Sequence, residues 1–299
     1  MTSHALLSRR RFIRSALGAA SVAPAVRLSA ARPSPPIIAF SKPFQHLGHE
    51  DCADFVADVG WDGIECPVRP KGQVEPERAA DELPALVEAL KRRGKAVLIG
   101  TTNITSVDTP HAERVLRALA AAGVRRYRMG YWKYSDRTPM ERQFSEIRAQ
   151  LKDLVEMSAG LGLQGGYQNH SGRQYVGAPV WDLHQLLQGV DPRSLGIIFD
   201  IGHATVEGGY SWPIEARLAR PRLTAVYVKD FTWGRTEKGW KARWCPLGQG
   251  MVDRRFFEPL LKEGYAGPVS QHHEYETDSP EAMRRLMRED LKTLKGWLA

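Results

Sequence analysis

The sequence predicts a single-domain α/β protein of the (β/α)8 TIM barrel class. Three observations predict it. Strand-like runs and amphipathic helical stretches alternate eight times, residues 32–299 suit one barrel of about 250 residues, and no internal repeat or linker divides the chain. Alternation of this kind indicates a parallel sheet with helical crossovers, so an open, doubly wound sheet is the rival architecture. Eight is the number of units that closes a barrel, which favours the barrel.

The strands and helices are placed as follows. We expect strands at residues 36–41, 62–66, 96–101, 124–130, 163–170, 195–200, 225–230 and 268–274. We expect helices at about 49–59, 77–93, 180–188, 211–219, 253–263 and 280–298, with two more that begin at Thr109-Pro110 and at Thr138-Pro139-Met140-Glu141. These two starts have a capping residue followed by proline at the first helical position, and the second also reads as a capping box.

The last helix opens with Ser279-Pro280. It carries an apolar stripe typical of a helix that faces the core, made of Met283, Leu286, Met287, Leu291 and Leu294. The longest irregular connection is predicted at residues 231–252, after the seventh strand. It contains Trp233, Trp240 and Trp244, and its length is typical of a functional lid. These tryptophans either stack on sugar rings or pack over the barrel rim.

The positive charge is concentrated at the N-terminus. The formal net charge is +8, and the first acidic residue is Glu50. The segment Ser8-Arg9-Arg10-Arg11-Phe12-Ile13-Arg14 resembles a twin-arginine export signal, and a mildly apolar run follows at 16–26. A disordered basic arm and a mitochondrial presequence are the alternatives. We therefore expect a signal peptide at 1–31, the twin-arginine translocase as a partner during export, and a periplasmic or secreted protein.

Cleavage after Ala31, or earlier after Ala25, removes the basic segment. Cleavage after Ala31 takes away five arginines and no acid, which leaves a charge of about +3. This small excess gives no reason to expect a nucleic-acid partner. The apolar run is shorter than the roughly 20 residues of a membrane span, so we expect no membrane anchor after cleavage.

Two other patterns predict structure rather than chemistry. Cys52, Cys66 and Cys245 lack the spacing of a metal site, and Cys52 and Cys66 are expected to be buried thiols. The stretch 160–165 matches the glycine pattern of dinucleotide-binding loops. It closes a helix and opens a strand, however, whereas a binding loop follows a strand and opens a helix.

Chemically useful residues gather at the carboxyl ends of five predicted strands, where barrel enzymes carry their catalytic groups. Because side chains alternate along a strand, residues two apart share a face. Gln168 therefore shares a face with His170, Tyr227 with Lys229, and His272 with Glu274. If those faces point inward, the barrel mouth is lined by Glu65, Gln168, His170, Asp200, His203, Lys229, His272 and Glu274. Such a set suits a divalent metal such as Mn²⁺, Zn²⁺, Co²⁺ or Mg²⁺, and it also suits acid–base chemistry beside a carbonyl.

The same residues resemble the sugar phosphate isomerase/epimerase superfamily, the xylose isomerase-like barrels that include endonuclease IV. The resemblance runs from about residue 36 to residue 274. It is carried by Asp62-Gly63-Ile64-Glu65, Gln168-Asn169-His170-Ser171-Gly172, Phe199-Asp200-Ile201-Gly202-His203, Val228-Lys229-Asp230, Pro246-Leu247-Gly248-Gln249-Gly250 and Gly267-Pro268-Val269-Ser270.

The resemblance implies a divalent metal at the barrel mouth, and this sequence departs from the implied ligands. The superfamily usually has Glu where Gln168 stands and His where Tyr227 stands, and its last Glu aligns best with His272. The metal is then held by a rearranged set of Gln168, Asp200 and His272, or it is absent.

The predicted function is that of an exported enzyme that abstracts a proton next to a carbonyl of a sugar or keto-sugar. Isomerisation and epimerisation are the leading reactions, and elimination from a 3-keto-glycoside is an alternative. A sugar-binding barrel without catalysis and an endonuclease IV-like nuclease are further alternatives. We predict His203, Lys229, Glu274 and Glu65 as catalytic residues. We predict that His170, Trp233 and Asp230 bind the substrate.

Overall fold

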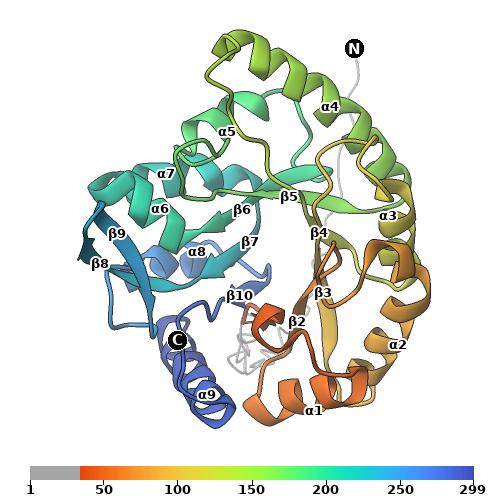
Figure 1. The fold of residues 1–299 in the computed structure, drawn as a ribbon, viewed down its shortest axis with the longest axis vertical. Coiled ribbons are helices and arrows are strands. Elements are labelled where there is room, and N and C mark those ends of the chain that lie inside the picture. Colours follow the sequence, from red (N-terminus) through yellow and green to blue (C-terminus); the bar gives the residue numbers. More distant parts are fainter. Residues whose placement is uncertain (1–33) are drawn as a thin grey trace, which may run out of the picture. The chain divides into compact units, whose positions relative to one another are not determined.

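The computed structural model describes residues 34–299, so the predicted signal peptide lies outside the described residues. Eight parallel strands form a closed barrel in the order β1-β10-β7-β6-β5-β4-β3-β2 (Figure 1). Their bounds are β1 Ile37–Phe40, β2 Gly63–Pro67, β3 Ala96–Thr101, β4 Arg126–Arg128, β5 Gln164–Gln168, β6 Leu195–Asp200, β7 Leu223–Val228 and β10 Val269–Gln271. The (β/α)8 prediction is confirmed, and the rival open sheet is wrong because β1 pairs with both β2 and β10.

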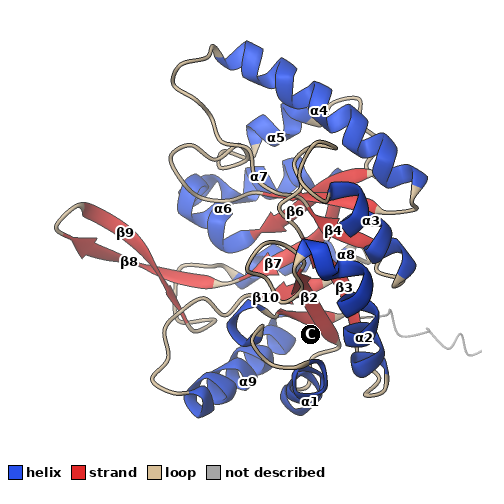
Figure 2. Ribbon diagram, turned by 45° about the vertical axis from the view of Figure 1, so that its right-hand side comes forward, coloured by secondary structure: helices blue, strands red, loops and turns tan. Residues whose placement is uncertain are grey.

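Helices surround the sheet (Figure 2). They are α1 His49–Val59, α2 Ala79–Lys91, α3 Ala112–Ala121, α4 Met140–Gly160, α5 Trp181–Leu186, α6 Ile201–Gly208, α7 Trp212–Ala219, α8 Phe257–Lys262 and α9 Pro280–Trp297. Short 3-10 turns lie at Lys42–Phe44, Pro76–Arg78, Gly209–Ser211, Arg220–Arg222 and Arg254–Phe256. Within residues 34–299, no helix has both the length and the apolar character needed to cross a membrane.

Of the three helix starts predicted from capping residues, one is confirmed and two are wrong. Ser279 caps α9, because its side chain accepts a hydrogen bond from the Ala282 amide at 3.1 Å. The predicted start at Thr109 is wrong, because its hydroxyl instead accepts from amides of the preceding turn and α3 begins at Ala112. The predicted capping box before α4 is also wrong, because Pro139 is the N-cap and no side chain caps the helix.

The connection after β7 is more regular than the sequence predicts. Strands β8 (Asp230–Thr236) and β9 (Gly239–Cys245) pair antiparallel, and this hairpin projects away from the barrel (Figure 2). Gly239 follows the two-residue turn with a φ of 105°, a conformation that favours glycine. The predicted irregular lid is therefore wrong in form, since most of this segment is a β-hairpin.

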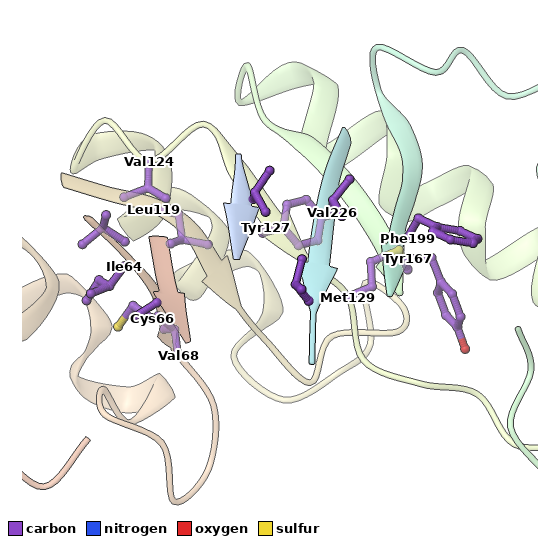
Figure 3. Close-up of a cluster of buried hydrophobic side chains, with 14 of the residues drawn as sticks. Ile64, Cys66, Val68, Leu119, Val124, Tyr127, Met129, Tyr167, Phe199 and Val226 are labelled. Atoms are coloured by element: carbon purple, nitrogen blue, oxygen red, sulfur yellow. The ribbon is translucent and has the colours of Figure 1, made fainter. Parts of the chain in front are cut away.

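Two layers of apolar side chains fill the fold. The outer layer lies between sheet and helices, where Ile64 and Cys66 of β2 are buried near Leu119 of α3 (Figure 3). Cys52 and Cys66 are free, buried thiols, as predicted. The inner layer includes side chains of strands that are not neighbours, such as β1, β3 and β6, and these can meet only inside the barrel. It consists of Ile38, Ile99, Ile198, Ala225 and Tyr227.

Candidate functional site

The inner layer fixes which strand residues reach the barrel mouth. Ile198 and Tyr227 point inward, so Asp200 and Lys229, two residues further along, point inward as well. On β2, Ile64 and Cys66 pack outward, which directs Glu65 between them into the barrel. Glu65, Asp200 and Lys229 therefore face the interior of the barrel at its mouth, as predicted, and all three are buried.

Asp200 ends β6 and caps the start of α6, a helix that was not expected from the sequence pattern. One carboxylate oxygen, Oδ1, accepts the backbone amide of His203 at 3.0 Å and so caps the helix. The Asp200 backbone is held by the Asn169 side chain, which accepts from its amide and donates to its carbonyl. This short strand-to-helix transition places His203 on the first helical turn, beside the carboxylate.

The second oxygen of Asp200, Oδ2, contacts three polar groups. The Gln168 side-chain amide donates to it at 2.7 Å. The Lys229 ammonium lies 3.3 Å away, and His203 Nε2 lies 3.7 Å away. Burial raises the pKa of Asp200, but the Lys229 ammonium and the hydrogen bond from the His203 backbone amide outweigh this and hold the pKa below its usual value.

Lys229 lies between two carboxylates. Besides Asp200, its ammonium pairs with Glu274 Oε2 at 3.2 Å, and it sits 4.7 Å from the centre of the Trp244 ring. Burial lowers the pKa of Lys229, but Asp200 and Glu274 outweigh it and raise the pKa. The pKa of Glu274 lies well below its usual value, because Lys229 outweighs the effect of burial. At neutral pH these groups therefore form a buried cation between two anions.

Glu65 and His272 form a second ion pair at the mouth. His272 Nε2 lies 2.9 Å from Glu65 Oε2, an oxygen that also accepts from the Ser270 hydroxyl at 2.8 Å. Thr101 donates to the other oxygen of Glu65. His272 Nδ1 lies 3.8 Å from Glu274, which connects this pair to Lys229. Glu65 outweighs burial and raises the pKa of His272.

His203 and His170 are neutral imidazoles. Burial, reinforced by Lys229, lowers the pKa of His203 well below its usual value and the pKa of His170 to about 4. The two rings lie 3.9 Å apart. Nδ1 of His203 is hydrogen-bonded to the Ser171 hydroxyl at 2.8 Å, whereas its buried Nε2 makes no hydrogen bond to the described residues. This nitrogen is therefore available to exchange a proton.

Several neighbours of this cluster were not among the predicted site residues. They are Thr101, Arg128, Tyr131, Ser171, Trp244 and Ser270. Tyr131 donates to Gln168 Oε1, and Arg128 stacks on the Tyr131 ring at 4.6 Å. The only signal in the sequence for Arg128 was a charged residue inside the strand predicted at residues 124–130; the structure shows it to be buried. No sequence pattern distinguished Trp244 from the other hairpin tryptophans.

The two hairpin residues predicted to bind substrate lie differently. Asp230 is buried, and its carboxylate accepts four backbone amides, from Phe231, Gly248, Gly250 and Val252. It therefore anchors the base of the hairpin. Trp233 is 42% exposed and meets Phe231 edge to face. Trp244, in contrast, contacts both Lys229 and His203. The substrate contacts of Asp230 and Trp233 remain predictions.

The predicted metal ligands do not assemble into a centre that fits a divalent ion. Asp200 and Gln168 contact each other, while the polar contacts of His272 go to Glu65 and Glu274. The Gln168 amide hydrogens, not its oxygen, face Asp200. In the part of the chain that is described, no three His, Cys, Asp or Glu residues are grouped so that they could hold a metal.

Solved structures with the same fold come from several bacteria. The 3-keto-D-glucoside 4-epimerase YcjR of E. coli superposes with a TM-score of 0.68 at 18% identity, covering 88% of this chain and 99% of that one. A xylose isomerase-like TIM barrel protein of Mycobacterium smegmatis, in complex with magnesium, gives a TM-score of 0.65 at 18% identity, covering 88% and 98%. At these identities the likeness shows a shared fold.

Sequence comparison supports the same assignment. A curated relative, the uncharacterized protein MJ1311 of Methanocaldococcus jannaschii, is 29% identical over 124 residues, a match that spans 40% of each chain. The family model described as xylose isomerase-like TIM barrel matches residues 53–297. The chain therefore belongs to the xylose isomerase-like TIM barrel family.

Proposed function

We propose that this protein is a carbohydrate isomerase or epimerase that moves a proton next to the carbonyl of a sugar or keto-sugar. The family and the fold support an enzyme that acts on carbohydrate. The residues at the barrel mouth support the type of chemistry, since they combine a buried cation with a neutral imidazole. Fold alone would not support it, because one fold hosts many activities.

The observation that carries the proposal is the shared contact of Lys229 and His203 with Asp200 Oδ2, at 3.3 and 3.7 Å. Proton abstraction beside a carbonyl needs a base for the proton and a positive group for the developing oxyanion. His203 offers an unpartnered Nε2, and Lys229 offers N–H donors on a positive charge. Asp200 holds both groups on the same side of the barrel mouth.

A 3-keto-glycoside is the substrate class that one comparison favours. The E. coli neighbour acts on a 3-keto-D-glucoside according to its description. In such a substrate, removal of the proton at C2 leads either to epimerisation or to loss of the substituent at C1. The two outcomes share the first step, so elimination is the second candidate reaction at the same site.

The first step is tested by solvent exchange. We expect the protein to incorporate deuterium from heavy water at the carbon next to the carbonyl of a 3-keto-glucoside, observed by NMR. Release of the C1 substituent in the same spectra would identify elimination. A protein that binds the keto-sugar, seen as a rise in melting temperature, but exchanges no proton would be a sugar-binding barrel, and the catalytic proposal would be wrong.

A matched pair of histidine variants assigns the base. His203→Asn removes the buried Nε2 and is expected to reduce exchange by about 10²- to 10⁴-fold, the range of general-base contributions. His46→Asn changes an exposed histidine of the loop before α1 and should leave exchange unchanged. If His203→Asn and His46→Asn exchanged deuterium at the same rate, His203 would not be the base.

Export is a separate part of the proposal. It is supported by Arg9 and Arg10 within the twin-arginine pattern. We expect cell fractionation to find the wild-type protein outside the cytoplasm and the double variant Arg9→Lys, Arg10→Lys inside it. Arg27→Lys, outside the pattern, serves as the control. Retention of the wild-type protein in the cytoplasm would contradict this assignment.

A further inference from the structure

The polar side chains at the barrel mouth already hold a cation, and this cation belongs to the chain. The Lys229 ammonium is 3.3 Å from Asp200 and 3.2 Å from Glu274, and the Lys229 side chain is only 2% exposed. A divalent ion bound by the same two carboxylates would meet this positive charge at short range. Like charges at such distances in a buried site repel strongly.

The remaining donors are also engaged in ways that oppose a metal. Gln168 donates its amide hydrogens to Asp200, and its oxygen accepts from Tyr131. Asp200 Oδ1 is used to cap α6. Tyr227 is a poor ligand for most divalent ions because burial raises the pKa of its hydroxyl well above 10.

The charges near Lys229 are balanced without a further ion. The carboxylates of Glu65, Asp200 and Glu274 face the buried cations Lys229 and Arg128, the half-buried cation Arg69 and the His272 imidazole. Three fixed positive charges therefore match three negative charges, and the His272 imidazole adds a titratable positive charge. A divalent ion would leave the cluster with excess positive charge in surroundings that solvate it poorly.

From this arrangement we infer that Lys229, clamped by Asp200 and Glu274, is the electrophile of the site and that the reaction needs no divalent metal. This inference rests on the proposed function. The base removes a proton from the carbon next to the carbonyl, and the C–H electron pair forms a C=C bond. The carbonyl π pair moves onto the oxygen, which the Lys229 ammonium stabilises. Return of the proton restores the carbonyl.

The position of Trp244 indicates where the substrate oxygen reaches Lys229. Two directions around the ammonium are taken by carboxylates, and a third faces the Trp244 ring at 4.7 Å. The oxygen of the substrate reaches the ammonium at the edge of this ring, which stays in contact with Lys229. The electrophile is therefore preorganised by its carboxylate partners before the substrate arrives.

Metal binding is tested independently of turnover. The full-length protein is stripped with EDTA, analysed for metal content, and titrated with Mn²⁺ by calorimetry and thermal shift. We expect no stoichiometric binding to the wild type. Lys229→Gln removes the cation between the carboxylates and should gain a Mn²⁺-dependent rise in melting temperature. Binding of one Mn²⁺ per wild-type chain, abolished by Asp200→Asn, would overturn the inference.

Turnover provides the second readout. Deuterium exchange into the keto-sugar is expected to be unchanged by EDTA and to fall about 10²- to 10³-fold in Lys229→Gln, the loss typical of an oxyanion donor. If that variant does not fold, Lys229→Arg, which keeps the charge, should retain partial exchange without added metal. Lys241→Gln, an exposed hairpin lysine, is the control and should behave as wild type.

The two proposals fail in different ways. Exchange that appears only after a divalent metal is added would overturn the metal-free electrophile while the proposed function stands. If no keto-sugar exchanges under either condition, the proposed function fails, and the Mn²⁺ titration alone decides whether Lys229 replaces the metal.

Discussion

At the residue scale, the lack of a side chain at Gly202 lets α6 approach Lys229. A Cβ placed there would lie 2.8 Å from both Lys229 Cγ and the Lys229 carbonyl oxygen. Such distances force the backbone or the lysine to move, and a displacement near 1 Å is costly in an active site. Gly202 is thus part of what positions the ammonium against Asp200.

We therefore expect Gly202→Ala to lose turnover by about 10- to 100-fold and stability by about 1–3 kcal/mol. The matched control is Gly296→Ala on α9, where nothing lies within 4 Å of the added Cβ. That substitution should stabilise the protein by up to about 1 kcal/mol. Deuterium exchange and thermal unfolding measure both effects. If Gly202→Ala kept the wild-type exchange rate and melting temperature, the space between α6 and Lys229 would be wide enough for a Cβ atom.

The residues of the site differ in how far the sequence could predict them. Lys229 and Asp200 were predictable, because both lie at the ends of strands of the predicted barrel, and Lys229 shares a strand face with Tyr227, which lies in the inner layer. The direction of the Gln168 amide was not, since it depends on Tyr131 and Asp200, which come from other parts of the chain. The same holds for Asp230, whose carboxylate binds amides of a loop about 20 residues further along.

At the scale of the element, the hairpin β8–β9 contributes one tryptophan to the site and exposes another. Trp244 lies over Lys229 and meets His203 edge to face, whereas Trp240 is 69% exposed. The hairpin escaped prediction because its strands bury little apolar surface, so the alternation that marks a half-buried strand is weak. Its regularity comes from pairing between β8 and β9 themselves.

We expect Trp244→Leu to weaken keto-sugar turnover on the order of 2- to 30-fold, the range for loss of a cation–π contact of about 0.5–2 kcal/mol. Trp240→Leu should leave turnover unchanged, since its ring contacts none of the site residues named above. The measurement is kcat/KM for exchange in the two variants. Similar losses in both would show that the hairpin acts as a whole rather than through Trp244.

Helix α7 carries a buried carboxyl group that makes stability depend on pH. Burial, followed by the nearby charge of Glu207, raises the pKa of Glu215 to about 7, and its Oε2 makes no hydrogen bond to the described residues. The folded state therefore holds this proton more tightly than the unfolded state, whose pKa is near 4.5. The resulting stabilisation is complete below pH 4.5 and is lost as pH rises through 7.

Glu215→Gln removes this titration. From pH 5 to pH 8 the wild type should lose roughly 1–3 kcal/mol of stability through this group, and the variant should not. Urea unfolding of both proteins at the two pH values gives the difference directly. If the free energy of unfolding changed equally in wild type and variant between pH 5 and pH 8, Glu215 would already be ionised at pH 5.

At the scale of the whole molecule, Glu65 connects strands on both sides of β1. This strand closes the barrel by pairing with β2 and β10. It lies on β2 and bonds to Thr101 of β3 on one side. Beyond β1, it bonds to Ser270 of β10 and to His272, which follows it. The barrel itself was predictable from eight alternations of strand and helix. These bonds across β1 were not, because they join residues about 205 positions apart.

The Glu65→Gln variant separates the structural and catalytic roles of this residue. The glutamine side chain carries an NH₂ group, which cannot accept the hydrogen bond that the Thr101 or Ser270 hydroxyl donates to Glu65. It is also uncharged, so the His272 cation would lose its ion pair with residue 65. Removing one member of a buried pair costs about 3–5 kcal/mol, which lowers the melting temperature on the order of 6–20 °C in a barrel of this size. Glu113→Gln, from an exposed helical ion pair on α3, should change stability by less than about 0.5 kcal/mol. If Glu65→Gln kept the wild-type melting temperature and lost only deuterium exchange, Glu65 would be a catalytic group. The closure of the barrel would then rest on its backbone pairing and apolar core.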